Sequence, residues 1–143
     1  MIGQPEFSGM WKAASLWNPV LDMTYMVNST DIPDWIYACC SSEGMDFASL
    51  SAERKVEYFN RSPMAHVQNV KTPAQFLIGD KDLRVPPHQA YFYEAALRQR
   101  GVETRIYNYP GSGHALLPVE HGCDATFNIS FWMDKYLVAP FEE

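Results

Sequence analysis

Three short apolar runs along the chain predict the strands of a sheet. The runs are Lys12–Trp17, Ala74–Ile78 and Thr104–Tyr109. Each stops at turn-forming residues: Asn18 with Pro19, then Gly79, then Pro110 with Gly111. Short continuous apolar runs between such residues are typical of a parallel sheet that is covered on both sides. We therefore expect three parallel strands, each buried on both faces.

The stretch between the second and third runs has the spacing of a helix. His88–Arg100 carries apolar residues on one helical face: Ala90, Tyr93, Ala96 and Leu97. Pro86 and Pro87 precede the stretch and Gly101 follows it, which is the usual punctuation of a helix. Strand, helix and strand in this order predict a βαβ unit.

A last helix is expected from about Cys123 to Leu137. Its apolar residues form a broad face: Phe127, Ile129, Phe131, Trp132 and Tyr136. Asp124 near its start and Lys135 near its end carry the charges that the helix dipole favours. Strands and helices together predict the α/β class, with a parallel sheet flanked by helices.

The stretch Leu21–Val70 is less regular and predicts short helices and loops. An amphipathic piece spans about Ser49–Asn60. Ser51 with Arg54 is not a capping box, because the residue three positions on is basic, so the helix start stays open by a few residues around Ser49. A long connecting segment between two sheet strands is a natural place for residues that contact a substrate.

Composition narrows the class of protein. With 143 residues, of which 47% are hydrophobic, the chain is long enough for a single domain, residues 1–143. A net charge of −6 without a Lys/Arg cluster argues against a nucleic-acid partner. No apolar run reaches the roughly 18 residues that span a bilayer, and the N-terminus lacks a signal-peptide pattern. Cys39, Cys40 and Cys123 lack the spacing of disulfide frameworks or zinc sites, so we expect reduced thiols and a cytoplasmic protein.

Asp82 and His114 are the candidate catalytic residues. Each lies in a loop that directly follows a predicted strand, and the acid precedes the histidine, as in the α/β-hydrolases. A histidine that takes and returns a proton needs a carboxylate on its other ring nitrogen to fix its tautomer. In a parallel sheet both loops would leave the carboxyl ends of neighbouring strands, where ligands bind.

A nucleophile is missing from this pattern. No G-x-S-x-G motif, the elbow that exposes the serine of an α/β-hydrolase, occurs in the 143 residues. Ser112 and Ser8 lie beside glycines but lack the strand-to-helix elbow. Cys39 and Cys40 have no neighbouring feature that would lower a thiol pKa. We therefore assign no nucleophile within the chain.

Other readings of the acidic and histidine residues remain open. Asp80 could serve as the turn residue or the acid in place of Asp82, and the two aspartates could bind a metal as a pair. The remaining histidines are scattered and form no metal set: His66, His88 and His121. We favour a site with no metal and no cofactor.

The residues around Asp82 and His114 resemble the prolyl oligopeptidase family of serine peptidases. The matching motifs are Gly79-x-x-Asp82-x-Arg84-Val85-Pro86 and Tyr109-Pro110-x-x-x-His114, with Thr72-Pro73 and Ser62-Pro63 upstream. Asn18-Pro19-Val20 and the segment Ser29–Trp35 look like the acylaminoacyl peptidases of that family. The resemblance covers essentially the whole chain.

The resemblance implies an α/β-hydrolase catalytic domain that releases N-acylated amino acids from short blocked peptides. Asp82 and His114 carry over as the acid and the base of the triad. By the same resemblance, Trp35 would line the acyl pocket, although plain packing is as open a role. Arg84 would bind a substrate carboxylate or carbonyl, or form a structural salt bridge.

The resemblance also implies that the chain is the C-terminal half of an α/β-hydrolase fold. The serine, the oxyanion hole, the early strands and the β-propeller would lie upstream of Met1, so the isolated chain is expected to be inactive. The alternative is a non-catalytic remnant that binds or regulates a full-length relative. Half a doubly wound sheet exposes an apolar strand edge, so we expect a homo-oligomer or association with such a relative.

Overall fold

The computed structural model describes residues 1–7, 9–40, 50–116 and 118–138. Its sheet has three parallel strands in the order β1-β2-β3: β1 (Ala14–Trp17), β2 (Ala74–Gly79) and β3 (Thr104–Tyr109). In the register, Phe76 of β2 lies beside Leu16 of β1 and Ile106 of β3. The expected parallel sheet is thus confirmed.

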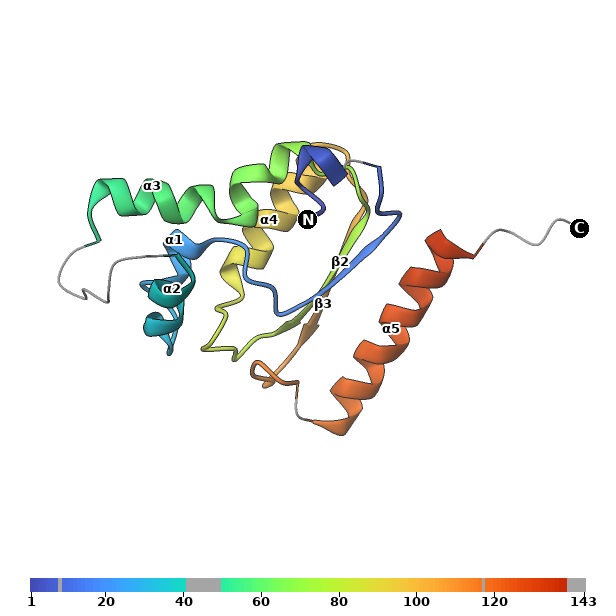
Figure 1. Ribbon diagram of the computed structural model, residues 1–143. Helices are drawn as coiled ribbons and strands as arrows, with labels where there is room; N and C mark the ends of the chain where they lie inside the picture. Colours follow the sequence, from blue (N-terminus) through green and yellow to red (C-terminus); the bar gives the residue numbers. More distant parts are fainter. Residues whose placement is uncertain (8, 41–49, 117, 139–143) are drawn as a thin grey trace, which may run out of the picture.

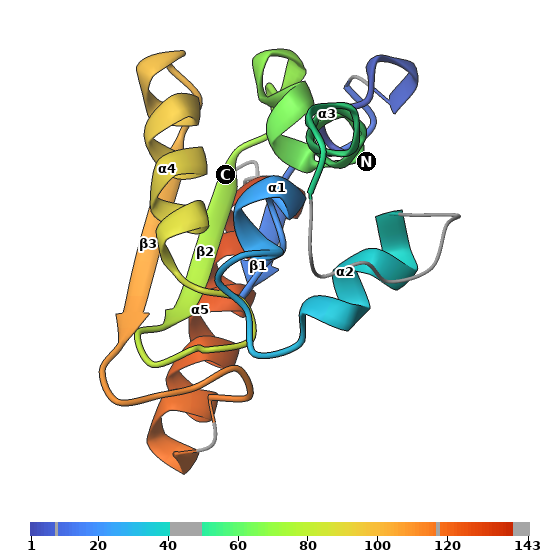
Figure 2. The same cartoon turned by 90° about the vertical axis from the view of Figure 1, so that its left-hand side faces the viewer.

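Helices cover the sheet on both faces. Helix α5 (Val119–Leu137) lies on one face, and α4 (His88–Gln99) with the 3-10 helix η2 (Pro63–Asn69) lies on the other (Figures 1 and 2). Three short helices extend the α4 side: α1 (Met23–Met26), α2 (Pro33–Cys40) and α3 (Ala52–Asn60). A 3-10 turn, η1 (Pro5–Phe7), lies near the N-terminus.

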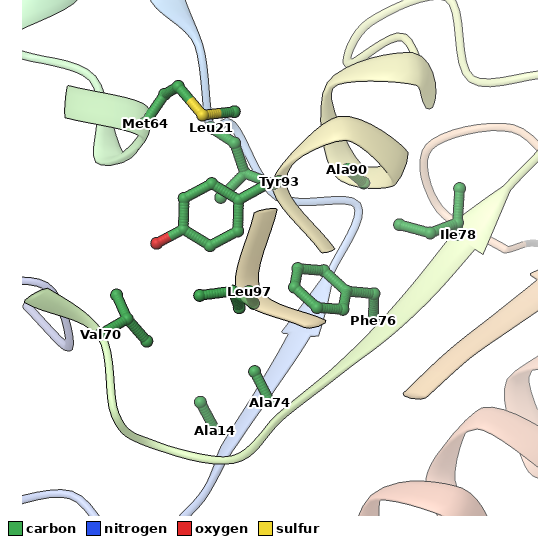
Figure 3. Packing of buried hydrophobic residues seen from close by; sticks show 10 residues of the cluster. All are labelled: Ala14, Leu21, Met64, Val70, Ala74, Phe76, Ile78, Ala90, Tyr93 and Leu97. Atoms are coloured by element: carbon green, nitrogen blue, oxygen red, sulfur yellow. The ribbon is translucent and has the colours of Figure 1, made fainter. Parts of the chain in front are cut away.

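The main core lies between the sheet and α4. Figure 3 shows Phe76 of β2 facing Tyr93 and Leu97 of α4, and the two aromatic rings meet edge to face with centroids 6.3 Å apart. The next residue of β2, Leu77, points to the opposite face and packs with Ala125 of α5. Successive side chains of a strand point to opposite faces, which is why one strand serves both cores.

Only the middle strand is buried throughout, so the expectation that all three strands are covered on both faces is wrong for β1 and β3. Every residue of β2 is buried, whereas Trp17 of β1 is 39% exposed and Tyr109 is the one fully buried residue of β3. Among the described strands, β1 and β3 each pair with β2 alone. An edge strand has one flank without a neighbour, and its side chains are correspondingly more open.

The first strand is also shorter than expected. It begins at Ala14 rather than Lys12. The Ala14 amide donates to the Pro73 carbonyl at 2.8 Å, and Pro73 itself has no N–H with which to continue the ladder backwards. The missing N–H of Pro73, directly before the neighbouring strand β2, therefore sets where β1 begins. The second strand is one residue longer than expected, because Gly79 still pairs with Tyr109.

Helix α5 begins four residues before the expected start, at Val119 rather than Cys123. The Gly122 amide already donates to the Pro118 carbonyl at 3.0 Å, so this glycine lies inside the helix instead of before it. Glu120 is the acidic residue of the first turn. Asp124 has a different role, since its carboxylate accepts a hydrogen bond from the Tyr109 hydroxyl at 2.9 Å.

The broad apolar face expected for this helix is divided in the structure. Ala125 and Trp132 are buried and Ile129 packs against the cluster that contains Ala125, but Phe127 and Phe131 are 64% and 69% exposed. A three-stranded sheet contacts only a narrow stripe of a helix, and the two phenylalanines fall outside it. Lys135 lies in the last turn, as expected.

The other helix boundaries differ little from expectation. Helix α4 ends at Gln99, one residue early, and Gly101 follows in the left-handed region with φ 78°. Helix α3 begins at Ala52, where the hydroxyl oxygen of Ser51 accepts from the Arg54 amide at 3.3 Å. Ser51 is thus an N-cap without the reciprocal bond of a capping box. The other possible start, Ser49, lies outside the described residues.

A second core joins the short helices α1, α2 and α3 of the segment between β1 and β2. Tyr37 of α2 and Tyr58 of α3 meet edge to face at 6.2 Å, and Met26, Ile36 and Val85 pack around them. Val85 belongs to the loop after β2, so this core attaches the segment between β1 and β2 to the loop that carries Asp82. In the described part of the chain, no helix is both long and apolar enough to cross a membrane, and the three cysteines are free thiols.

The buried Tyr93 is expected to make folding sensitive to alkaline pH. Burial raises the pKa of this phenol to about 12, whereas the unfolded chain loses the proton near 10. Between these values the unfolded state binds fewer protons, so the free energy of unfolding should fall with rising pH, by about 2–3 kcal/mol in all. Below about pH 10 this contribution is fully present.

Urea unfolding at several pH values measures this loss. The variant Tyr93→Phe should lack that part of the pH dependence, while the control Tyr25→Phe, whose ring is 40% exposed, should retain it. An unchanged alkaline slope in Tyr93→Phe would contradict the assignment.

Candidate active site

Asp82 and His114 lie against each other at the carboxyl ends of β2 and β3. Because these strands are parallel neighbours, the loops after Gly79 and Tyr109 leave the same edge of the sheet. Nδ1 of His114 is 2.8 Å from Oδ2 of Asp82. The carboxylate is 0% exposed and the imidazole 45% exposed, so the acid is enclosed and the histidine opens to solvent.

The loop backbone holds the Asp82 side chain in place. Its other oxygen, Oδ1, accepts from the amides of Arg84 and Val85, both at 2.9 Å. One carboxylate oxygen therefore binds its own loop and the other faces the imidazole. A buried carboxylate with all these bonds made is a rigid partner for a histidine.

Asp80 faces a different partner. Its Oδ1 accepts from the Gly111 amide at 2.7 Å and so ties the first loop to the second. The carboxylates of Asp80 and Asp82 are thus directed to separate bonds, which does not favour a shared metal ion. Among the described residues, no three His, Cys, Asp or Glu side chains are grouped as metal ligands would be.

The two loops also meet through their backbones. The Lys81 amide donates to the Ser112 carbonyl at 2.9 Å. Gly79 is so close to the second loop that a Cβ there would lie 2.5 Å from the Gly113 oxygen and 2.6 Å from the Ser112 oxygen. Only glycine leaves room for this approach, so the residue that ends β2 is fixed by the loop that carries His114.

Ser112 is buried and lies beside a different histidine. It is 1% exposed, and its Oγ is 2.6 Å from Nδ1 of His121. The ring of His121 packs against Tyr109, whose pKa is raised to about 12 by burial, so that its hydroxyl keeps the proton it donates to Asp124. The other serine considered, Ser8, lies outside the described residues. His66 and His88 lie on η2 and α4, away from this cluster.

A cavity of about 400 Å³ opens beside His114. Trp35 and Arg84 line it together with His114, and its remaining walls are largely apolar side chains such as Val20, Met26 and Ile32. This size is within the range of pockets that hold small ligands. A larger cavity of about 530 Å³ lies between α1 and α4, but neither Asp82 nor His114 lines it.

Arg84 makes the salt bridge that the sequence left open. Its Nε is 3.5 Å from Oδ1 of Asp31, and both side chains are about half exposed. An exposed pair at this distance contributes at most about 1 kcal/mol. The Arg84 carbonyl accepts from the Thr30 hydroxyl at 2.7 Å, which fixes the backbone and leaves the guanidinium beside the cavity.

Asn18 is the residue that sequence reasoning missed. We expected it to close the first strand and counted it in the Asn18-Pro19-Val20 motif, with no role at the site, yet its side-chain amide donates to the His114 carbonyl at 2.7 Å and accepts from the Gly79 amide at 2.9 Å. Its local signal, a place beside Pro19 at a strand end, is shared by ordinary turns, and the motif that contains it does not by itself indicate a role for the side chain.

Comparison with known proteins gives a consistent picture. The model of the prolyl oligopeptidase family matches residues 4–139. Acylamino-acid-releasing enzyme 2 of Oryza sativa subsp. japonica is 39% identical over 140 residues, a match that covers 96% of this chain and 18% of the relative. Acylamino-acid-releasing enzyme of Homo sapiens is 38% identical over 143 residues, with the same shares covered. The chain therefore spans less than a fifth of the length of these curated relatives.

Solved structures agree on the fold. Uncomplexed Pyrococcus horikoshii acylaminoacyl peptidase superposes with a TM-score of 0.79 at 21% identity, over 99% of this chain and 22% of that one. An acylaminoacyl peptidase in complex with Z-Gly-Gly-Phe-chloromethyl ketone superposes with a TM-score of 0.76 at 21% identity, with the same shares covered. The fold is that of the α/β-hydrolases.

Proposed function

Since the chain belongs to the prolyl oligopeptidase family, we propose that it supplies the acid and the base of a serine hydrolase of the acylaminoacyl-peptidase type. The observation that carries the proposal is the 2.8 Å contact between the enclosed Asp82 carboxylate and the half-exposed His114 imidazole. A buried acid behind an open histidine is the arrangement that acyl transfer requires.

The proposal gives Asp82 and His114 distinct tasks. With Nδ1 directed at Asp82, the imidazole carries its proton there and leaves Nε2 as the base. Nε2 has no hydrogen-bond partner among the described residues, so it is free to take the proton of an attacking hydroxyl. It then returns that proton to the leaving amine, while Asp82 stabilises the imidazolium formed in between.

The nucleophile is proposed to lie outside the 143 residues. They contain no G-x-S-x-G elbow, and Ser112 is enclosed beside His121. We take residues 1–143 as the C-terminal portion of the catalytic domain, in keeping with the small share of its relatives that the chain spans. The rest of such an enzyme would bring its serine to the open side of His114.

The cavity beside His114 is the proposed substrate site. Trp35 is 41% exposed on its wall and offers an apolar surface to an acyl group or side chain. Arg84 presents hydrogen-bond donors to a substrate carbonyl or carboxylate. A mainly apolar wall with one cation beside the base suits a short blocked peptide, and the peptide ketone bound to a structural neighbour supports that class.

The free edge of β1 is proposed to be covered in the working protein. Trp17 at its end is 39% exposed and Trp11 just before it 36% exposed. An apolar strand edge of this kind invites pairing with a further strand. The nucleophile-bearing portion, or a second chain that carries it, would satisfy both the edge and the site.

The experiment examines the native protein that carries these residues. It is labelled with a fluorophosphonate, the labelled serine is mapped by mass spectrometry, and hydrolysis of an N-acetylated amino-acid anilide is measured. We expect a labelled serine outside residues 1–143 and release of the acylated amino acid. Labelling of a serine within the 143 residues would contradict the proposed origin of the nucleophile. A native protein with neither labelling nor hydrolysis would favour the non-catalytic alternative, a remnant that binds or regulates a relative.

A further inference from the structure

We propose that Asn18 is a positioning residue that holds His114 opposite Asp82. The inference deepens the proposed function and rests on it for the role of His114, but its geometric content stands on the structure alone. Asn18 lies at the end of β1 and takes no part in the contact between the acid and the base. It acts on that contact through two backbone groups.

The Asn18 side chain bridges the loops that carry the two residues. Its Oδ1 accepts from the Gly79 amide at 2.9 Å, where the loop of Asp82 begins, and its Nδ2 donates to the carbonyl of His114 at 2.7 Å. Asp82 is in turn fixed to its own loop, since its amide donates to the Gly79 carbonyl at 3.2 Å. One amide group therefore sets the distance between the start of the acid loop and the histidine itself.

The other bonds between the loops hold an earlier part of the second loop. Asp80 binds Gly111 and the Lys81 amide binds Ser112, two or three residues before the histidine. In the described part of the chain, Asn18 provides the side-chain bond to the His114 backbone. Without it, the ring contact with Asp82 is the hydrogen bond that remains on His114 itself, while Leu116 two residues further on stays packed in the core.

The backbone of Asn18 indicates that this bridge has a cost. Its φ is 38°, in the left-handed region where a residue other than glycine is uncommon, and it is only 4% exposed. Asparagine is among the residues that tolerate this conformation. Glycine would suit the backbone but make neither bond, and aspartate would accept from Gly79 but could not donate to His114. Asparagine alone of these three satisfies both the conformation and both bonds.

This difference between the substitutions gives a sharp test. In Asn18→Asp the acceptor for Gly79 remains, and the donor to His114 is replaced by a carboxylate that repels its carbonyl. In Asn18→Gly both bonds are lost without backbone strain. The control is Asn69→Asp, which removes a comparable bond from Asn69 Nδ2 to the Gly3 carbonyl, 3.3 Å long and remote from the site.

The readouts are made by NMR on the native protein that carries these residues, labelled with ¹⁵N. They are the solvent-exchange rate of the His114 Nδ1 proton, the ring tautomer from its ¹⁵N shifts, and the exchange rate of the Gly79 amide. Exchange requires the hydrogen bond to open, and loss of one buried hydrogen bond shifts the equilibrium between closed and open forms about tenfold. We expect Asn18→Asp to raise Nδ1 proton exchange about tenfold with Gly79 unchanged, and Asn18→Gly to raise both. Asn69→Asp should change neither.

Two results would overturn the inference. One is Nδ1 exchange in Asn18→Asp equal to that of the Asn69→Asp control. The other is a parallel rise at amides throughout the chain, which would mark a general structural role. If Asn18→Asp does not fold, Asn18→Gly carries the same test, because it also removes the bond to the His114 carbonyl and should also raise the exchange rate of the His114 Nδ1 proton. The readout is a hydrogen bond rather than turnover, so a native protein without hydrolase activity would refute the proposed function and leave this inference standing.

Discussion

Replacing Asp82 with asparagine is expected to lower kcat for an N-acetylated amino-acid anilide about 10⁴-fold in the native protein that carries this chain, the loss typical when a triad acid becomes an amide. The carboxylate accepts from the Arg84 and Val85 amides through Oδ1 and faces His114 Nδ1 through Oδ2. An asparagine that keeps its oxygen toward the backbone amides must direct its NH₂ group at the imidazole. That donor would favour the tautomer with the proton on Nε2, the nitrogen that must be unprotonated to act as the base.

Asp80→Asn is the matched control for this prediction. Asp80 lies two residues away, likewise accepts from a backbone amide, that of Gly111 in the second loop, and can keep that bond as an asparagine through its remaining oxygen. We expect its kcat to fall less than about tenfold, since it loses a charge but no hydrogen bond. Equal losses in the two variants would contradict the choice of Asp82 as the acid, and a larger loss in Asp80→Asn would reverse it.

The second large effect is expected on stability, from Phe76→Ala. Phe76 is 0% exposed at the centre of β2, and its ring packs edge to face against Tyr93 (Figure 3). Truncation removes the buried ring and leaves a cavity enclosed by strand and helix, which cannot easily collapse. Such changes lower the free energy of unfolding by about 3–5 kcal/mol.

Denaturant unfolding followed by circular dichroism measures this loss. A suitable control is Phe92→Ala, on the outward side of α4, where the side chain is 68% exposed and the expected change is within about 0.5 kcal/mol. Similar losses for the two variants would show that β2 and α4 do not enclose the main core. A shift of the unfolding midpoint without a change in m, the slope of the free energy of unfolding against denaturant concentration, would indicate that the folded and unfolded states keep their compactness.

The candidate site could be located from sequence because its two residues are marked by local signals. Asp82 and His114 each follow an apolar run that ends in glycine or proline, and a parallel arrangement brings two such ends together. The choice between Asp82 and Asp80 rested on the resemblance of the surrounding motif. In the structure Asp82 is the aspartate in contact with the histidine, while Asp80 binds Gly111.

The burial of individual positions was harder to predict. Phe127 and Phe131 have the same hydrophobicity as buried residues, and nothing local distinguishes them from Trp132, yet they are largely exposed. Which stripe of α5 is covered depends on the width of the sheet beneath it. The width of a sheet depends on how many strands pair, which is a non-local property.

The sequence by itself determined the order of strands and helices, the parallel sheet and the two loops that carry Asp82 and His114, because periodicity and turn residues act over a few positions. Only the tertiary structure decided that Asn18 bridges these loops and that Gly79 admits no side chain. Both features depend on contacts between residues at least 33 positions apart, Gly79 with Ser112 and Gly113 and Asn18 with Gly79 and His114. Such contacts leave no periodic trace in the chain, since they arise when the strand ends meet in space.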